Sequence, residues 1–423
     1  MKLIYESILV LVFICASHQA QATNYYIDPS ASSSHNKGTQ SDPWTDPARV
    51  NDLMDSFKAG DSILFRRGQW FHQSIVIRCS GTTTAPVYFG AYGPESGRPV
   101  FLYPKGASGQ VELIRCAQVH DVVIADWEIT DDKLRRSDPS VLSRIKTAIA
   151  LESAARIQIL RCDISNVGVG VNILGSDNKV MQTSFTSLRM VRNTAGGNDD
   201  YGANPVVIAG ANNEIGECVF RHCWARSYDY EYDGGAIEFF GPDCARNRIW
   251  GNTAFDCNGF IEMGSDAGGV ALDNIIESNL VVNCGDFLYI NNKGDYAIHV
   301  RNLYIQKNVV IQSIEQLTKP AQLIGLTSPS ADPDVLFLKQ NIFWVSTGIN
   351  LLRPGMLTPT QVRSSGNTIY LKSGNSNLPV SSSNKIMSAA SKQLNCATVG
   401  STFCDKMDLY PYRYLIPHWQ TIF

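Results

Sequence analysis

"NIIESNLVV", residues Asn274 to Val282, is the stretch that best predicts the fold of this chain. Two short apolar runs stand on either side of a polar segment. Apolar and polar positions alternate over these runs, which is typical of strands and not of helices. The Asn inside the stretch suits a tight turn, because Asn tolerates a left-handed backbone and can stack on the Asn of a neighbouring copy.

The same pattern recurs along the chain at irregular intervals, mostly within the range of about 20 to 50 residues that is typical of solenoid repeats. The other copies are "DVVIADWEI" (121–129), "IQILRCDI" (157–164), "NEIGECVF" (213–220), "NRIWGNTAF" (247–255), "LYIQKNVVI" (303–311) and "LFLKQNIFW" (336–344). Short strands with an Asn ladder and no helical crossovers predict an all-β parallel β-helix. A propeller would repeat about every 40 residues or more, and a sandwich would not repeat.

The chain resembles the right-handed parallel β-helix proteins of the pectate-lyase-like superfamily. The resemblance rests on "YYIDPSASSSHNKGTQSDPW" (25–44), "KAGDSILFRRGQWF" (58–71) and "APVYFGAYGPESGRPVF" (85–101), and on the Asn-bearing repeats up to about Tyr370. It implies an architecture and not one activity. Many members of the superfamily cleave or modify polysaccharides, and others are non-catalytic surface proteins, so the function has to be argued from the site.

The ends of the chain predict export and capping. Residues 1–22 have the apolar core and the A-x-A ending of a signal peptide, so we expect the mature protein in the periplasm or outside the cell. Residues 23–380 are predicted to form the β-helix, and 381–423 an aromatic tail or cap. A short helix from Asp46 to about Phe57 is expected to cap the first coil. We expect a monomer without a transmembrane segment.

The formal net charge of −3 excludes the basic face that nucleic-acid binding needs. Ten cysteines follow the predicted signal peptide, an even number for an oxidising compartment. Cys396 and Cys404 enclose a short loop that a disulfide could staple. Cys257 and Cys284 are expected in one column, either bonded or stacked as buried thiols.

Two stretches, "GAIEFFG" (235–241) and "GFIEMG" (259–264), carry a glutamate at the same place. Aligning the coils on this strand gives an inward column of Ile149, Val171, Val206, Ile237, Ile261, Leu288 and Ile349. The next residue of each coil then points outward, because strand side chains alternate faces. That outer column is Ala150, Asn172, Val207, Glu238, Glu262, Tyr289 and Asn350.

Glu238 and Glu262 are therefore expected side by side on coils about 4.8 Å apart. Like charges opposite each other destabilise a sheet, so we interpret the pair as functional. With Asp233 in support, these are the predicted catalytic carboxylates. The predicted substrate-binding residues are Tyr289, Asn172, Arg226, His222, Lys293 and Tyr232. A Ca²⁺ ion could be held by Asp199, Asp200, Asp229 and Glu231, and no other cofactor is expected.

Carboxylates beside aromatic side chains are typical of sites that act on polysaccharides. The favoured hypothesis is a glycoside hydrolase in which the two glutamates share acid and nucleophile or base roles. The second is a polysaccharide lyase or uronate epimerase that uses Ca²⁺ and a base such as Lys293, Arg226, His222 or Tyr289. The third is a non-catalytic glycan-binding or adhesin-type surface protein.

Overall fold

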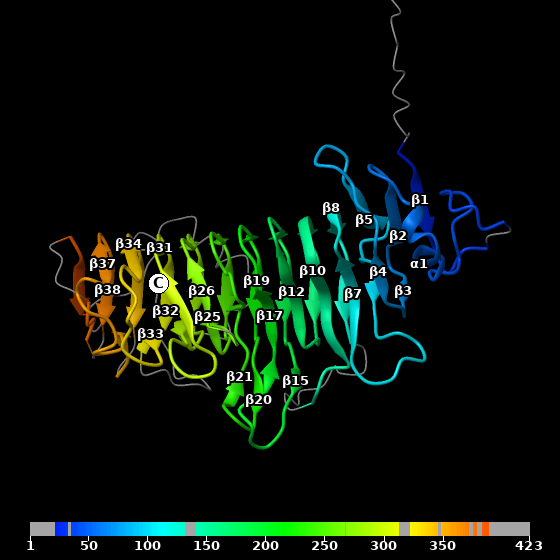
Figure 1. Cartoon of the computed structure of the whole chain (residues 1–423). Coiled ribbons are helices and arrows are strands. Elements are labelled where there is room, and N and C mark those ends of the chain that lie inside the picture. Colours follow the sequence, from blue (N-terminus) through cyan, green and yellow to red (C-terminus); the bar gives the residue numbers. More distant parts are fainter. Residues whose placement is uncertain are drawn as a thin grey trace, which may run out of the picture.

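The protein is a parallel β-helix whose coils stack along one long axis (Figure 1). The computed structural model describes residues 22–32, 35–131, 141–266, 268–312, 322–345, 348–371, 375–378 and 383–388. The strands form a 21-stranded sheet, which bends into two faces of the solenoid, and a 12-stranded sheet, which forms the third. The predicted fold class is thus confirmed.

The first face carries the glutamates. Its strands are β4 (Ile75–Ile77), β7 (Val111–Ala117), the first part of β10 (Ile145–Leu160), β12 (Val169–Ser176), β17 (Asn204–Ile208), β22 (Ile237–Phe240), β25 (Gly259–Gly264), β29 (Asp286–Ile290), β33 (Gln322–Leu326) and β36 (Asn350–Leu352).

The second face belongs to the same sheet, and β10 joins the two by running through the corner. Its other strands are β1 (Asn24–Ile27), β2 (Ser62–Arg66), β5 (Val87–Tyr92), β8 (His120–Ala125), β13 (Lys179–Met181), β18 (Glu214–Gly216), β23 (Arg248–Trp250), β27 (Ile275–Glu277), β31 (Leu303–Gln306), β34 (Leu336–Lys339) and β37 (Val362–Ser365).

The third face is the 12-stranded sheet. It contains β3 (Trp70–Phe71), β6 (Val100–Phe101), β9 (Glu128–Thr130), β11 (Asp163–Ser165), β14 (Ser184–Thr186), β19 (Val219–Arg221), β24 (Thr253–Phe255), β28 (Leu280–Val282), β32 (Val309–Gln312), β35 (Ile342–Val345), β38 (Thr368–Leu371) and β39 (Lys385–Ser388). The stretch from Asn274 to Val282 therefore spans β27, a corner and β28.

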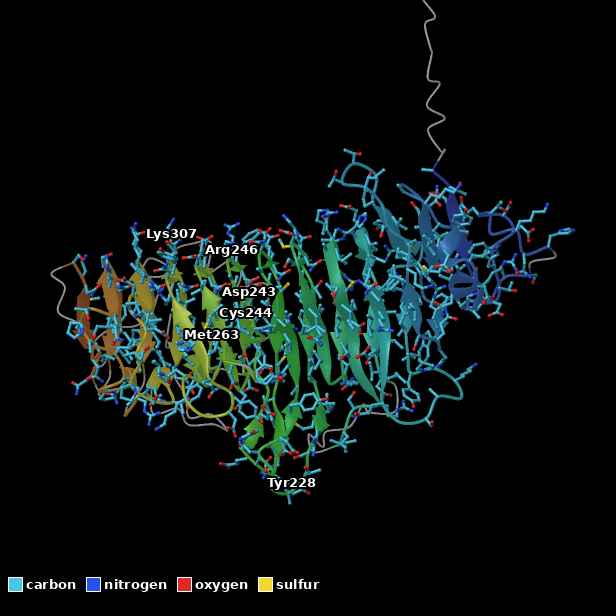
Figure 2. All side chains as sticks on the ribbon, viewed as in Figure 1. Tyr228, Asp243, Cys244, Arg246, Met263 and Lys307 are labelled. Carbon is cyan, nitrogen blue, oxygen red and sulfur yellow. The ribbon has the colours of Figure 1, made fainter. Side chains whose placement is uncertain are left out.

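Three strand pairs form separate two-stranded sheets: two antiparallel pairs lie outside the coils, and one parallel pair stacks within them, with Ala271, Ile298 and Val300 in the core. They are β15 (Met190–Arg192) with β16 (Tyr201–Gly202), β20 (Ala225–Ser227) with β21 (Glu231–Asp233), and β26 (Gly269–Leu272) with β30 (Ile298–Arg301). The β20–β21 hairpin projects from the middle of the solenoid, with Tyr228 at its tip (Figures 1 and 2).

Two ladders of buried asparagines join the coils, as predicted. One contains Asn178, Asn213, Asn247 and Asn274; the other contains Asn252, Asn279, Asn308, Asn341, Asn367 and Asn384. After the first Asn of each ladder, each side-chain oxygen accepts a bond from the backbone N–H of the Asn one coil earlier. The left-handed backbone falls on the residue before the ladder position, such as Asp273 (φ 56°) or Ser278 (φ 55°), and not on the Asn itself.

The predicted N-terminal helix is shorter than expected. It consists of α1 (Arg49–Asp52) followed by a 3₁₀ turn, η1 (Met54–Ser56). Ala48, not Asp46, is the N-cap, and the Asp46 carboxylate accepts a bond from the Ala48 N–H at 2.9 Å. Phe57 is extended and packs its ring against Tyr25, with ring centroids 5.1 Å apart.

The predicted signal peptide (apart from Ala22), nearly all of the aromatic tail, and the Cys396–Cys404 pair lie outside the described residues. In the part of the chain that is described, no helix has the length and apolarity needed to cross a membrane.

Asn279→Ala should lower the free energy of unfolding by about 2–4 kcal/mol, because it leaves the buried Asn252 N–H and Ile249 carbonyl without partners. Denaturant titration measures the change. Gln306→Ala, which removes a side-chain bond to Glu277 at the edge of a coil, serves as the control and should stay within about 0.5 kcal/mol of the parent. Equal changes in the free energy of unfolding for the two substitutions would contradict a stabilising role of the Asn ladder.

Candidate active site

The predicted outer column exists over most of its length. Asn172 pairs with Val207, Val207 with Glu238, Glu238 with Glu262, and Glu262 with Tyr289. Beyond Tyr289 the prediction is wrong, because Gly325 of β33 takes the next place. Asn350 pairs instead with Gln322, and Leu352, not Ile349, continues the inner column after Ile324.

Asp286 belongs to the same face although strict alternation from Tyr289 places it inside. The chain turns a corner here, so two consecutive residues, Phe287 and Leu288, are both fully buried. The residue before them therefore faces outward again. The preceding coil has the same corner, with buried Phe260 and Ile261 after Gly259, which pairs with Asp286.

These strands form the floor of a cavity of about 1170 Å³. The β20–β21 hairpin and the loops after β15 and β29 form its walls. Acidic side chains dominate the described lining: Asp199, Asp200, Asp233, Glu238, Glu262, Asp286 and Asp295. Lys293 is the one basic side chain among the described lining residues. The cavity thus carries a strong excess of negative charge or of protonated carboxyl groups.

Four of these carboxyl groups have raised pKa values. Each is enclosed by neighbours yet keeps part of its surface open to the cavity. Burial, reinforced by the charge of Glu262, raises the pKa of Asp233 to about 8 and that of Asp286 to about 7. Burial also raises the pKa of Glu238 to about 8, and the charges of Glu262 and Asp233 add to the effect. Burial raises the pKa of Glu262 as well.

Side-chain amides hold both glutamates. The Asn291 amide donates to Glu262 Oε1 at 2.9 Å, and the Asn204 amide donates to Glu238 Oε2. A donor stabilises the charged form of a carboxyl group and lowers its pKa without adding a counter-charge. Glu238 and Glu262 lie on adjacent coils and burial raises the pKa of both, so a charge on one opposes a charge on the other.

Tyrosines line the walls of the cavity. Tyr230 and Tyr232 come from the β20–β21 hairpin, next to Asp233. The Tyr296 hydroxyl, from the loop after β29, donates to the Asn198 carbonyl at 2.7 Å, in the loop between β15 and β16. This bond connects the two walls across the floor. Sequence reasoning had no signal for it, because the partners are 98 residues apart.

Not every predicted binding residue reaches the cavity. Tyr289, Asn172, Lys293 and Tyr232 line it, whereas Arg226 and His222 do not. His222 follows β19 on the third face, where its Nδ1 lies 2.6 Å from Asp256. Arg226 is exposed and lies over the outer side of the Tyr232 ring, 5.4 Å from its centroid. Placing either residue at the site from loop length alone was wrong.

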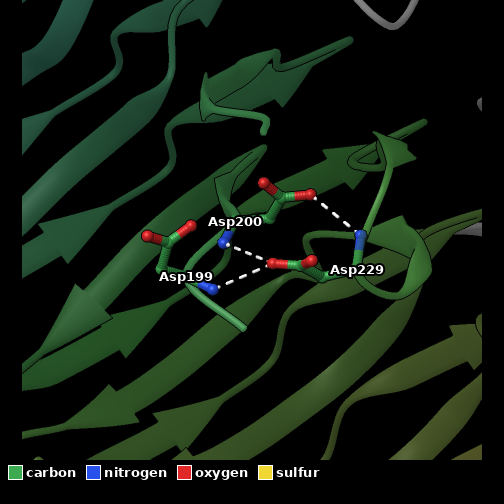
Figure 3. Close-up of side chains that lie close together, drawn as sticks. All are labelled: Asp199, Asp200 and Asp229. Carbon is green, nitrogen blue, oxygen red and sulfur yellow. Dashed lines mark hydrogen bonds between the residues drawn. The ribbon is translucent and has the colours of Figure 1, made fainter. Parts of the chain in front are cut away.

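Three of the four predicted Ca²⁺ ligands come together (Figure 3): Asp199, Asp200 and Asp229. Glu231 is exposed and is not part of this group. Backbone N–H groups already point at the oxygens, since Asp229 Oδ2 accepts from Asp199 at 2.9 Å and Asp200 Oδ2 from Asp229 at 3.1 Å. Burial raises the pKa of Asp200, but bonds from the Ser227 hydroxyl and from the backbone N–H groups of Thr194, Asp229 and Tyr228 outweigh it and hold that pKa below its usual range. The cluster ties the hairpin to the β15–β16 loop, and its three carboxylates could supply part of the six to eight oxygens of a Ca²⁺ shell.

The cysteine column is also present. Cys257 and Cys284 are free, buried thiols, and the Cys257 sulfur lies in hydrogen-bond contact with both Cys284 and Cys223. Of the two alternatives, the stacked thiols are confirmed.

Comparison with known proteins agrees with this architecture. A family model described as the right handed beta helix region matches residues 147–320. Lacto-N-biosidase from Bifidobacterium longum subsp. longum is 33% identical over 155 residues, which are 36% of this chain and 9% of that protein. The chain thus spans about a tenth of the length of this curated relative.

Two solved structures share the fold. GH136 lacto-N-biosidase from Eubacterium ramulus superposes with a TM-score of 0.51 and 14% identity, over 86% of this chain and 68% of that one. A rhamnogalacturonan lyase superposes with a TM-score of 0.56 and 14% identity, over 82% of this chain and 87% of that one. The chain is a right-handed parallel β-helix protein, as its sequence resemblance implies.

The raised carboxyl pKa values predict that stability falls with rising pH. An unfolded carboxyl group titrates near pH 4, so between about pH 4 and pH 8 the native protein holds more protons than the unfolded chain. The contribution is present at low pH and is lost as the pH rises through the native pKa. Glu238→Gln should therefore raise the melting temperature at pH 8 by about 2 °C or more, and should flatten its decline from pH 5 to pH 8.

Glu152→Gln provides the matched control, since Arg115 holds the pKa of the Glu152 carboxyl below its usual value. This substitution should bring no gain at pH 8. A melting temperature of Glu238→Gln that follows the parent at both pH values would contradict the titration assigned to the cavity.

Proposed function

We propose that the protein hydrolyses glycosidic bonds in a neutral glycan, with Glu262 and Glu238 as the reacting carboxyl groups. One observation carries this proposal: the two glutamates stand on adjacent coils inside an acidic cavity, where burial raises the pKa of both and a charge on one opposes a charge on the other. Glycoside hydrolysis needs such a pair, an acid that protonates the leaving oxygen and a carboxylate that stabilises or attacks the anomeric carbon.

The roles follow from the surroundings of each carboxyl group. Glu238 is the general acid, because burial and the adjacent charge keep its proton near neutral pH. Glu262, held by Asn291, is the carboxylate. Directly paired strands place their residues about 5 Å apart, which corresponds to the short separation of retaining enzymes. Glu262 would then attack the anomeric carbon while Glu238 protonates the departing oxygen, and water would release the sugar with Glu238 as base.

Asp233 and Asp286 support this pair. Both have raised pKa values because they are buried and because they flank the Glu262 charge. A protonated carboxyl group can donate a hydrogen bond to a sugar hydroxyl or to Glu262. Asn172, Asn204, Asn258 and Asp286 each have a buried oxygen without a donor. Unpaired acceptors that line one cavity favour a ligand rich in hydroxyl groups. Such hydroxyl groups would donate to these acceptors through a water molecule or after a small side-chain rotation.

The charge of the cavity speaks against elimination from a uronate. A lyase or a uronate epimerase must neutralise the substrate carboxylate and remove the C5 proton. The described lining offers seven acidic side chains and one lysine, which disfavours a uronate carboxylate in the cavity. Hydrolysis of a neutral glycan needs neither a cation nor a base of that kind. Of the relatives named above, one is a lacto-N-biosidase, which supports the same reading.

Glu262→Gln and Glu238→Gln should each lower kcat by roughly 10³-fold or more, as losses of single reacting groups do. The assay follows reducing ends and ultraviolet absorbance together on neutral and uronate-containing polysaccharides. Glu217→Gln, at an exposed turn, is the control. New absorbance from a C=C bond would assign a lyase, and unchanged turnover in both Gln variants would reject the pair.

The activity should fall as the pH rises through about 8, because Glu238 then loses the proton that the leaving oxygen needs. The decline on the acidic side reports protonation of Glu262. The pH dependence of kcat/KM measures both limbs in the free enzyme. Activity that keeps rising above pH 9 would contradict the role of Glu238.

We also propose that the chain acts after export, as the signal-like residues 1–22 predict. Mass spectrometry of the exported protein should find Thr23 at its N-terminus.

A further inference from the structure

The backbone conformation of Gly325 does not explain why a glycine stands at this position. It lies inside strand β33, where a glycine weakens pairing and packing. Its φ is not in the left-handed region that would require a glycine. The remaining reason for a glycine within a strand is the close approach of another group.

That group is the Tyr289 ring. A Cβ at Gly325 would lie 2.9 Å from Tyr289 Cδ2, closer than real Cβ contacts come, and 3.1 Å from Cε2, which is a tight contact. The ring of Tyr289 therefore leans from its own coil onto the glycine of the next. Because Gly325 has no Cβ, the Cδ2–Cε2 edge of the ring can lie against the strand while Tyr289 lines the cavity.

We infer that Gly325 is a positioning residue, and that it lays the Tyr289 ring beside Glu262 as the platform on which the sugar to be cleaved stacks. This inference rests on the proposed hydrolysis. Flat aromatic faces pack well against the C–H face of a pyranose, which is apolar, while carboxyl groups beside them contact its hydroxyls.

The order of residues along the axis also orients the substrate. Glu238, Glu262 and Tyr289 occupy three successive coils. The carboxylate lies by the anomeric carbon and the acid lies by the leaving oxygen. The sugar that keeps its anomeric carbon thus lies over Tyr289, toward the C-terminal coils, and the leaving group extends over Val207 toward Asn172.

The test uses 4-nitrophenyl glycosides of neutral mono- and disaccharides, in which the leaving group is small. Tyr289→Ala should raise KM by roughly 5- to 30-fold and change kcat much less, and Tyr289→Phe should retain the parent KM. Gly325→Ala should raise KM in the same direction because its methyl group displaces the ring.

Gly216→Ala is the matched control. Gly216 also lies in a strand under an aromatic ring, with its Cβ position 2.6 Å from Trp250 Cε2, but on the second face and away from the cavity. It should lower the melting temperature as Gly325→Ala does and leave KM unchanged.

Binding to the inactive Glu262→Gln protein separates the two proposals. Calorimetry with the same glycosides should show that adding Tyr289→Ala weakens binding. If the parent hydrolyses a glycoside and Tyr289→Ala leaves its KM unchanged, the platform is overturned and hydrolysis stands. If nothing is hydrolysed but Tyr289→Ala abolishes binding, the platform stands as a glycan-binding surface. If the panel is neither cleaved nor bound, both are overturned.

Discussion

Hydrogen bonding between neighbouring coils, at a strand spacing of about 4.8 Å, is the constraint on which the whole structure depends. It stacks each residue on its counterpart one coil away, whatever that residue is. For asparagine the stacking is favourable, because each amide donates to one coil and accepts from another. For phenylalanine it gives the parallel rings of Phe260 and Phe287, 5.6 Å apart. For glutamate the same geometry brings like charges together.

On the second face, charged side chains of neighbouring coils serve stability alone. There, Lys179, Glu214 and Arg248 follow one another in register, and each acid contacts a base, with Lys179 Nζ 2.9 Å from Glu214. On the first face, Glu238 and Glu262 have amides as partners and no base. Amides hold the carboxyl groups in place without fixing both as anions. Because no base lies beside them, the pKa values of both buried carboxyl groups stay raised. The proposed chemistry uses a protonated acid beside a carboxylate.

The sequence was sufficient for what short-range periodicity controls. Period two and the recurring Asn predicted the solenoid, the glutamate pair and Tyr289 beside it. It was insufficient where the chain turns corners, since two successive inward residues hide Asp286 from any alternating pattern. His222 was misplaced for a related reason, because a residue a few positions beyond a corner lies on another face. No sequence pattern predicts that Asn204 and Asn291 belong to the site, because only their contacts with the two glutamates identify them.

The walls of the cavity obey a different rule from its floor. The floor is set by register, so each residue there is determined by the residues of the adjacent coils. The walls are insertions between coils, and they meet through long-range contacts such as the Asp199–Asp229 bond and that of Tyr296 with Asn198. An insertion can change without moving a coil, because the ladders and the apolar core hold the solenoid independently of it. The carboxyl pair is therefore the fixed part of this site, and the loops that carry Tyr230, Lys293 and Tyr296 are the part in which glycan selectivity would be set.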